Sequence, residues 1–205
     1  LDFALTVGGE GPLGPLFSDG NGGELFDLAI ANPPYVRTQV LGQRQARTIA
    51  QRFGLEGRVD LYHAFLLGIA EVLEPGGVAG VIVSNRFLTT QAGASVRSEL
   101  IERYELLHVW DLGDTKLFEA AVLPAVLLLR KKGKAVVTRQ KTRFTSVYSC
   151  AENGKRSRHT ESIFDVVGRS GIFVLPDASE FHVTQCKLDV GNRLGDVWRL
   201  SNPET

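Results

Sequence analysis

The chain of 205 residues carries no net charge, and its 43% apolar and 22% charged residues are ordinary for a soluble globular protein. Its longest apolar run, Ala120 to Leu129, is far shorter than the roughly 20 residues needed to cross a membrane, so we expect a cytoplasmic protein. Methionine is absent even at position 1, and we therefore expect a fragment of a longer protein. Cys150 and Cys186 stand outside any C-x-x-C pair, which predicts free thiols and no metal site.

Short apolar runs bounded by turn residues predict strands at 1–7, 26–31, 78–83, 106–110 and 121–129, with 26–31 buried. Helical spacing predicts helices over 60–73, with Asp60 as the N-cap, and over 93–103. Strands that alternate with helices predict a mainly parallel, doubly wound α/β sheet. Beyond residue 133 the sequence becomes irregular, and 134–148 predicts a hairpin or an extended strand. We therefore expect a domain over 1–133 and an extension over 134–205.

Charge is unevenly distributed along the chain. Residues 37–58 hold five arginines and one acid, and residues 130–158 hold ten basic residues and one acid. Such segregation is expected where a polyanion lies against one face, although solvated basic loops give the same pattern. We predict nucleic-acid contacts from these two segments at Arg37, Arg44, Arg47, Lys131 and Lys132.

Asn32-Pro33-Pro34-Tyr35 follows the predicted strand 26–31 at its carboxyl end, where ligands bind in open α/β sheets, and Ser84-Asn85 ends the next strand in the same way. The exocyclic amine of adenine is a poor nucleophile because its lone pair is delocalised into the ring. Two acceptors that hold its two N–H bonds free the lone pair for attack on a methyl sulfonium. The side-chain oxygen of Asn32 and the carbonyl of Pro33 are two such acceptors.

The neighbouring residues suit the same chemistry. Two consecutive prolines fix φ, so the Pro33 carbonyl is held in place before a substrate arrives. Tyr35 offers a flat face to a base swung out of a duplex. The tetrapeptide therefore predicts methylation of a conjugated amine, although a rigid strand-ending turn with a buried tyrosine would have the same sequence.

The segment LFDLAIANPPYVR resembles motif IV of the amino-methyltransferases that use S-adenosylmethionine. The chain keeps the order of the gamma-class DNA adenine methyltransferases of restriction–modification and related phage-defence systems, with Asp2-Phe3 before this segment and DLYHAF and LEPGG after it. Leu194-Gly195-Asp196 is similar to the start of that family's target-recognition domain. The resemblance implies a Rossmann-like class I methyltransferase sheet and methylation of the N6 amine of adenine in double-stranded DNA.

The resemblance also implies two groups of site residues. Those that handle the flipped adenine are Asn32, Pro33, Pro34, Tyr35 and Phe118. Those that contact S-adenosylmethionine are Asp2, Phe3 and Phe65. The family's glycine-rich cofactor loop should lie upstream of Leu1, so we expect residues 1–205 alone to be inactive. A restriction or specificity module is expected in the same chain or in a partner subunit.

Related chemistries use similar motifs. Cytosine-C5 methylation is excluded because neither cysteine follows a proline, and methylation of the cytosine amine usually has Ser or Asp in place of Asn32. Protein-glutamine methyltransferases also use N-P-P-Y, but they typically end soon after the last strand of the sheet, whereas this chain continues with a basic segment. The sequence is also compatible with methylation of adenine in RNA and with a catalytically inactive DNA-binding subunit.

Overall fold

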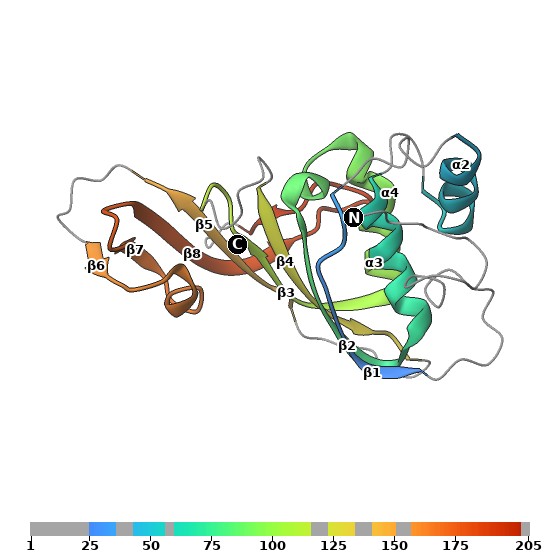
Figure 1. Cartoon of the computed structure of the whole chain (residues 1–205), viewed down its shortest axis with the longest axis horizontal. Helices are drawn as coiled ribbons and strands as arrows, with labels where there is room; N and C mark the ends of the chain where they lie inside the picture. Colours follow the sequence, from blue (N-terminus) through green and yellow to red (C-terminus); the bar gives the residue numbers. More distant parts are fainter. Residues whose placement is uncertain are drawn as a thin grey trace.

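Figure 1 shows the computed structural model, which describes residues 25–35, 43–55, 60–115, 123–133, 141–150 and 157–201. Within these ranges the strands form one nine-stranded sheet in the order β1-β2-β4-β3-β5-β8-β7-β6, and β9 pairs with β8. The helices gather beside β1 and β2 on the right of Figure 1, whereas β6 and β7 form the far left end.

Four strands make the half of the sheet that meets the helices: β1 (Phe26–Ala31), β2 (Leu73–Ser84), β3 (Tyr104–Asp111) and β4 (Pro124–Lys131). β1 and β2 are parallel, and β4 lies antiparallel between β2 and β3. β1, β2 and β3 therefore end at one edge of the sheet, which we call the C-terminal edge. The prediction of a mainly parallel sheet is wrong at β4, because a chain that turns back beside β3 pairs antiparallel without a helical crossover.

Three helices lie in the described ranges: α2 (Gln43–Arg52), α3 (Leu61–Val72) and α4 (Ala94–Arg103). Two short 3-10 helices, η2 (Asn85–Leu88) and η3 (Gln91–Gly93), connect β2 to α4. The predicted helices are confirmed as α3 and α4, and Asp60 has the extended backbone of an N-cap although its side chain makes no capping bond. The sequence patterns did not predict α2. No helix of the described ranges is long and apolar enough to span a membrane.

The main core lies between the helices and the strands β2, β3 and β4. Every residue of α3 from Leu61 to Ala70 is buried, so this helix is enclosed on all sides. Burial alternates along β2 from Gly77 to Val83, as expected when one face of a strand meets a helix layer.

β1 forms as predicted, but it is not buried. Phe26, Leu28 and Ile30 are 53%, 60% and 81% exposed, and β2 is the neighbour of β1 in the described sheet. Alternate residues of a strand share one face, so these three side chains lie on a face of β1 that is left uncovered. The apolar run of β1 thus predicted the strand correctly, but the prediction that this strand is buried was wrong.

The sheet continues past residue 133, where the sequence suggested a boundary. β5 (Arg143–Ser149) pairs in parallel with β3, and β8 (Glu180–Asp189) pairs with β5. The remaining strands are β6 (Ser157–His159), β7 (Gly171–Val174) and β9 (Arg199–Leu200). The side chains of Val147 on β5, Phe173 on β7 and Val183 on β8 belong to a second buried cluster. The extended strand predicted within 134–148 is confirmed at 143–148, and the division into two domains stays a prediction.

His63 makes the stability of the fold depend on pH. It is 3% exposed on α3, neither ring nitrogen has a hydrogen-bond partner among the described residues, and burial lowers its pKa to about 4. In the unfolded chain His63 takes up a proton near pH 6.5, whereas in the folded chain it does so only near pH 4. The free energy of unfolding is therefore highest above pH 6.5 and falls as the pH drops towards 4. The expected loss is roughly 3 kcal/mol at the acid end of this window.

Urea unfolding of His63→Leu at pH 7.5 and pH 5 measures the effect. We expect the pH dependence to fall by about half, because leucine has no proton to take up while His108 keeps its own contribution. His108, whose pKa is also lowered to about 4 by burial and by the charge of Arg143, accounts for the remaining slope. An unchanged slope in the variant would contradict the assignment to His63.

Candidate active site

Asn32-Pro33-Pro34-Tyr35 lies at the C-terminal edge, directly after β1. Ala31 is the last paired residue and lies opposite Val81 of β2. Beyond it Asn32 is exposed, Pro33 is buried, and Pro34 and Tyr35 are partly buried. The strand end therefore leaves the side chain of Asn32 exposed, next to a buried proline.

The hydroxyl of Tyr35 holds the Asn32 side chain. It donates to Asn32 Oδ1 at 3.2 Å and lies 3.3 Å from the carbonyl oxygen of Ile82 on β2, so its single hydrogen is shared between two acceptors. Partial burial raises the pKa of Tyr35, so this phenol is a donor at neutral pH. A carbonyl oxygen has two lone pairs, and Asn32 Oδ1 can accept a second hydrogen bond.

The ring of Tyr35 is supported by the helix layer. Its centroid lies 6.3 Å from that of Tyr62 at an angle of 59°, and it packs against the main core. Tyr62 is buried on α3. Sequence reasoning assigned Tyr35 only the role of a flat face for a base, whereas the structure adds an orienting bond to Asn32 that no local pattern predicts.

A second polar cluster, formed by Asn85, Asp111 and Tyr148, lies along the same edge. Asn85 Nδ2 donates to Asp111 Oδ1 at 2.9 Å, and the Tyr148 hydroxyl donates to Asp111 Oδ2 at 2.8 Å. Burial and the Asp111 carboxylate raise the pKa of Tyr148, which keeps this hydroxyl protonated. The three residues come from the ends of β2, β3 and β5, strands that run in one direction, so the edge bearing Asn32 extends across to Tyr148.

Sequence reasoning placed Asn85 at a strand end but missed Asp111 and Tyr148. Asp111 could have been found, because it ends a predicted strand in the same way as Asn85 does. Tyr148 left no such signal, since it lies in the segment that the sequence placed outside the domain.

The predicted nucleic-acid contacts that the structure describes lie on two separate elements. Arg44 and Arg47 lie on α2, and Arg37 is outside the described residues. Lys131 and Lys132 lie at the far end of β4 from Pro124, where their ammonium groups donate to the carbonyls of Leu73 and Ile101. That end of the sheet is roughly 25 Å from the C-terminal edge, at about 3.3 Å per strand residue.

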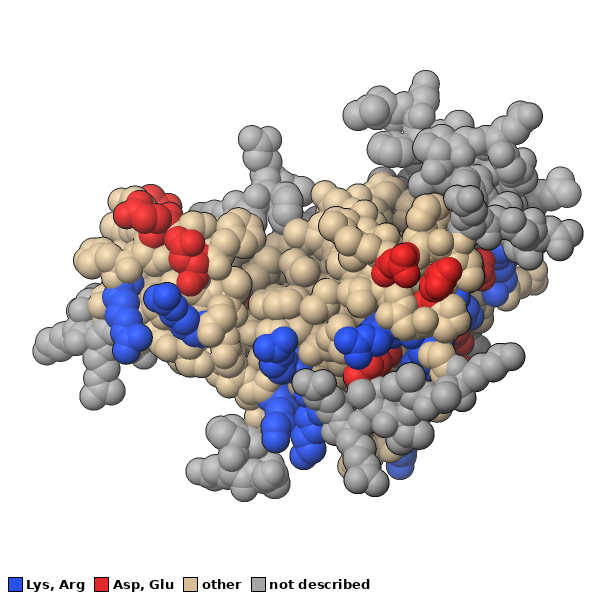
Figure 2. Space-filling view, turned by 90° about the horizontal axis from the view of Figure 1, so that it is seen from below, with Lys and Arg blue, Asp and Glu red and all other residues tan. Residues whose placement is uncertain are grey.

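Other basic side chains lie on the face shown in Figure 2. This view from below Figure 1 shows Lys and Arg side chains spread from left to right, with acidic side chains at the upper left and among the basic ones on the right. Arg143 starts β5 and lies opposite Lys187 of β8, and Arg130 pairs with the buried Glu105 at 3.0 Å. The contacts predicted at Lys131 and Lys132 therefore belong to a surface remote from Asn32, and they stay a prediction.

The predicted cofactor contacts are only partly visible. Asp2 and Phe3 lie outside the described residues, as does Phe118, the aromatic expected beside the base. Phe65 lies on α3 as a buried member of the main core. Its burial fits an apolar wall, but the described residues alone do not make a site for S-adenosylmethionine.

The described fold and its strand-end motif define a class of protein. Residues 15–118 match the Eco57I restriction-modification methylase family, and the chain belongs to this family. The order of motifs that the sequence analysis identified is therefore that of a restriction–modification methyltransferase family, as the resemblance implied.

Two curated relatives illustrate the match. The chain is 40% identical over 207 residues to a type II methyltransferase, M.BanIII, from Aneurinibacillus aneurinilyticus, an alignment that covers 99% of this chain and 36% of the relative. It is 35% identical over 120 residues to M.XhoI from Xanthomonas vasicola, covering 56% of this chain and 22% of that protein. The chain thus spans about a third or less of the length of these relatives.

Solved structures agree on the fold. The M protein of the type I restriction enzyme EcoKI superposes with a TM-score of 0.51 at 17% identity, covering 92% of this chain and 46% of that one. A Listeria monocytogenes protein assigned to the class I S-adenosylmethionine-dependent methyltransferases gives 0.51 at 18% identity over 62% of this chain and 38% of its own. The predicted fold class, a Rossmann-like class I methyltransferase sheet with a β-rich extension, is confirmed.

Proposed function

We propose that the full-length protein transfers a methyl group from S-adenosylmethionine to the N6 amine of adenine in double-stranded DNA, within a restriction–modification or related defence system. The observation that carries the proposal is the exposed carboxamide of Asn32, oriented by Tyr35 at the C-terminal edge. Membership of the Eco57I methylase family and the names of the curated relatives support DNA methylation as the activity.

The chain's own residues would act on the amine by accepting hydrogen bonds. Asn32 Oδ1 keeps one lone pair after the Tyr35 bond, and the carbonyl of Pro33 provides the second acceptor. Together they hold both N–H bonds of the amine and localise its lone pair for attack. Because the donor Tyr35 and two prolines fix the acceptors in advance, little reorganisation is needed during the reaction.

The base must leave the double helix to reach this site, and its ring would be held by stacking. In this proposal Tyr35 and Phe118 supply the aromatic surfaces, and Arg37, Arg44 and Arg47 contact the phosphates close to the flipped base. When bound, S-adenosylmethionine supplies the methyl group, and Asp2, Phe3 and Phe65 contribute to its binding. We expect residues 1–205 alone to bind this cofactor poorly and to transfer no methyl group, and calorimetry can measure the binding.

The proposal is tested by incubating the full-length protein with S-adenosylmethionine labelled in the methyl group and with a double-stranded DNA library. Digestion to nucleosides and mass spectrometry then identify the methylated base. N6-methyladenine is the expected product. Label in N4-methylcytosine would overturn the proposal, as would the absence of transfer to the DNA.

A further inference from the structure

Arg97 joins two segments that are far apart in the sequence. It lies on α4 and is 2% exposed. Its guanidinium donates to four backbone carbonyls. Two belong to the connection after β2, at Phe87 and Thr90, and two belong to residues 98 and 99 positions further along, Gly195 and Asp196.

The planar guanidinium explains why an arginine occupies this position. It offers five N–H donors in a fixed fork, so carbonyls on two sides are held in one geometry. Nη1 bonds Phe87 O at 2.5 Å and Thr90 O at 2.9 Å, while Nε bonds Asp196 O at 2.7 Å. Burying a charge is costly unless it is fully hydrogen-bonded, and these carbonyls provide that compensation.

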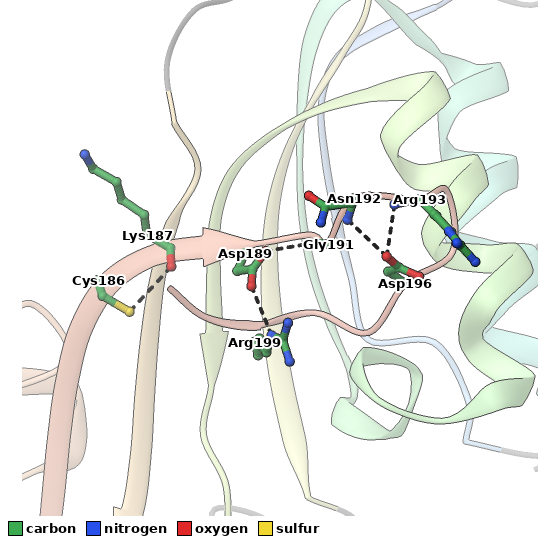
Figure 3. Close-up of polar contacts among 8 residues, drawn as sticks. All are labelled: Cys186, Lys187, Asp189, Gly191, Asn192, Arg193, Asp196 and Arg199. Carbon is green, nitrogen blue, oxygen red and sulfur yellow. Dashed lines mark hydrogen bonds and ion pairs between the residues drawn. The ribbon is translucent and has the colours of Figure 1, made fainter. Parts of the chain in front are cut away.

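Residues 189–199, which we call the docking loop, are shaped to meet Arg97. Figure 3 shows the Asp196 carboxylate accepting the backbone N–H groups of Asn192 and Arg193, at 3.0 and 2.9 Å. At the base of the loop, Asp189 accepts from Arg199 at 3.0 Å. The carboxylate of Asp196 is thus used inside the loop, and its backbone carbonyl is left to face Arg97.

The loop lies directly on α4. Gly195 has φ +83°, and a Cβ placed there would come within 3.1 Å of the Ala94 carbonyl oxygen. A side chain would therefore be strained by the backbone conformation and would also press the loop away from the helix.

Trp198 makes a second attachment. Its backbone N–H donates to Leu88 O at 2.8 Å, and its buried ring meets the Phe87 ring edge-on at 5.7 Å between centroids. Phe87 and Leu88 belong to η2, which begins at Asn85 on the C-terminal edge. The docking loop is therefore attached to the segment that continues directly from the edge bearing the proposed active site.

We propose that Arg97 is a positioning residue that fixes the docking loop, and with it the path of the chain beyond Trp198, relative to Asn32. This inference rests on the proposed function. If the rest of the protein contacts bases around the target adenine, its distance from Asn32 must be constant for one adenine to be chosen over its neighbours. A rigid attachment between residues 87–90 and 195–198 supplies that constancy.

The test compares Arg97→Gln with Arg103→Gln in the full-length protein. Both arginines lie on α4, but the guanidinium of Arg103 pairs with Glu99 of the same helix, so its loss leaves the contacts of the docking loop in place. Hydrogen exchange of residues 191–198 should become at least tenfold faster in Arg97→Gln and stay near wild type in Arg103→Gln. Gly195→Ala weakens the same contact from the side of the docking loop and should also speed the hydrogen exchange of residues 191–198. This variant provides the test if Arg97→Gln fails to fold.

The functional readout is the ratio of methylation rates at the recognised DNA site and at sites with one changed base. We expect this ratio to fall roughly tenfold in Arg97→Gln and in Gly195→Ala, with partial recovery in Arg97→Lys. Unchanged exchange in both variants would overturn the attachment, and faster exchange with an unchanged ratio would overturn its role in fidelity. Wild-type protein that transfers no methyl group would refute the proposed function, while the exchange data would still decide whether Arg97 fixes the loop.

Discussion

Replacing Asn32 with alanine should lower the rate of methyl transfer by the full-length protein by roughly 10²–10³-fold, the usual effect of removing one preorganised polar group that acts in the transition state. The side chain is exposed at the strand end, so its loss leaves no cavity and should not destabilise the fold. The measurement is a single-turnover assay with labelled cofactor, with thermal unfolding of both proteins as a check on folding.

Tyr35→Phe is the matched variant, because it removes only the hydroxyl that orients Asn32 and keeps the ring that packs near Tyr62. One neutral hydrogen bond contributes about 1 kcal/mol, so we expect a loss of roughly fivefold in rate, well below that of Asn32→Ala. If Asn32→Ala kept the wild-type rate, Asn32 would have no part in the reaction. Equal losses in the two variants would instead assign the effect to the tyrosine hydroxyl.

Replacing Gly93 with alanine should destabilise the fold by about 1–3 kcal/mol, the usual cost of forcing atoms into a packed interior. A Cβ on Gly93 would lie 2.3 Å from Phe87 O and 2.8 Å from both Phe87 Cα and Arg97 Nη1. The backbone angles at Gly93 are ordinary, with φ −81° and ψ −7°, so the expected cost is steric. Urea unfolding followed by circular dichroism measures it.

Gly80→Ala is the control for this prediction. It lies within β2, and a Cβ there would meet no atom within 4 Å. Alanine restricts the unfolded chain more than glycine does, so we expect no loss and a gain of about 0.5 kcal/mol. If both variants lost the same stability, the close approach of Gly93 to Phe87 would not be the cause.

Several parts of the fold could be predicted from local patterns. The spacing of Leu61, Phe65 and Ile69 identified α3 within one residue at each end. Both the apolar spacing of a buried helix and its N-cap residue are local features of the sequence. Apolar runs located β1, β2, β3 and β4, and NPPY was placed correctly at the end of β1. The strands β6, β7, β8 and β9 were not predicted, and the strand predicted over 1–7 lies outside the described residues. α2 was missed, since its residues are polar and its helical character shows only weakly in composition.

Other properties of the same segments depend on what lies beside them. The composition of β1 suits burial, yet the face that carries Ile30 is left uncovered, and this side chain is 81% exposed. Lys131 and Lys132 belong to a basic segment, but the direction of β4 takes them to the edge opposite Asn32. A one-dimensional pattern specifies neither the order of strands nor their direction, and these two quantities decide which side chains meet.

The place of Asn32-Pro33-Pro34-Tyr35 at a strand end was therefore predictable from the sequence alone, because four adjacent residues carry that signal together. Their role in methyl transfer stays a prediction. The bond from Tyr35 to Asn32, the cluster of Asn85, Asp111 and Tyr148, and the attachment of the docking loop by Arg97 required the folded molecule. The hydrogen bonds of Arg97 reach carbonyls 98 positions away, and a backbone carbonyl is present at every residue. No residue type marks which carbonyl will be used, so only packing in three dimensions selects it.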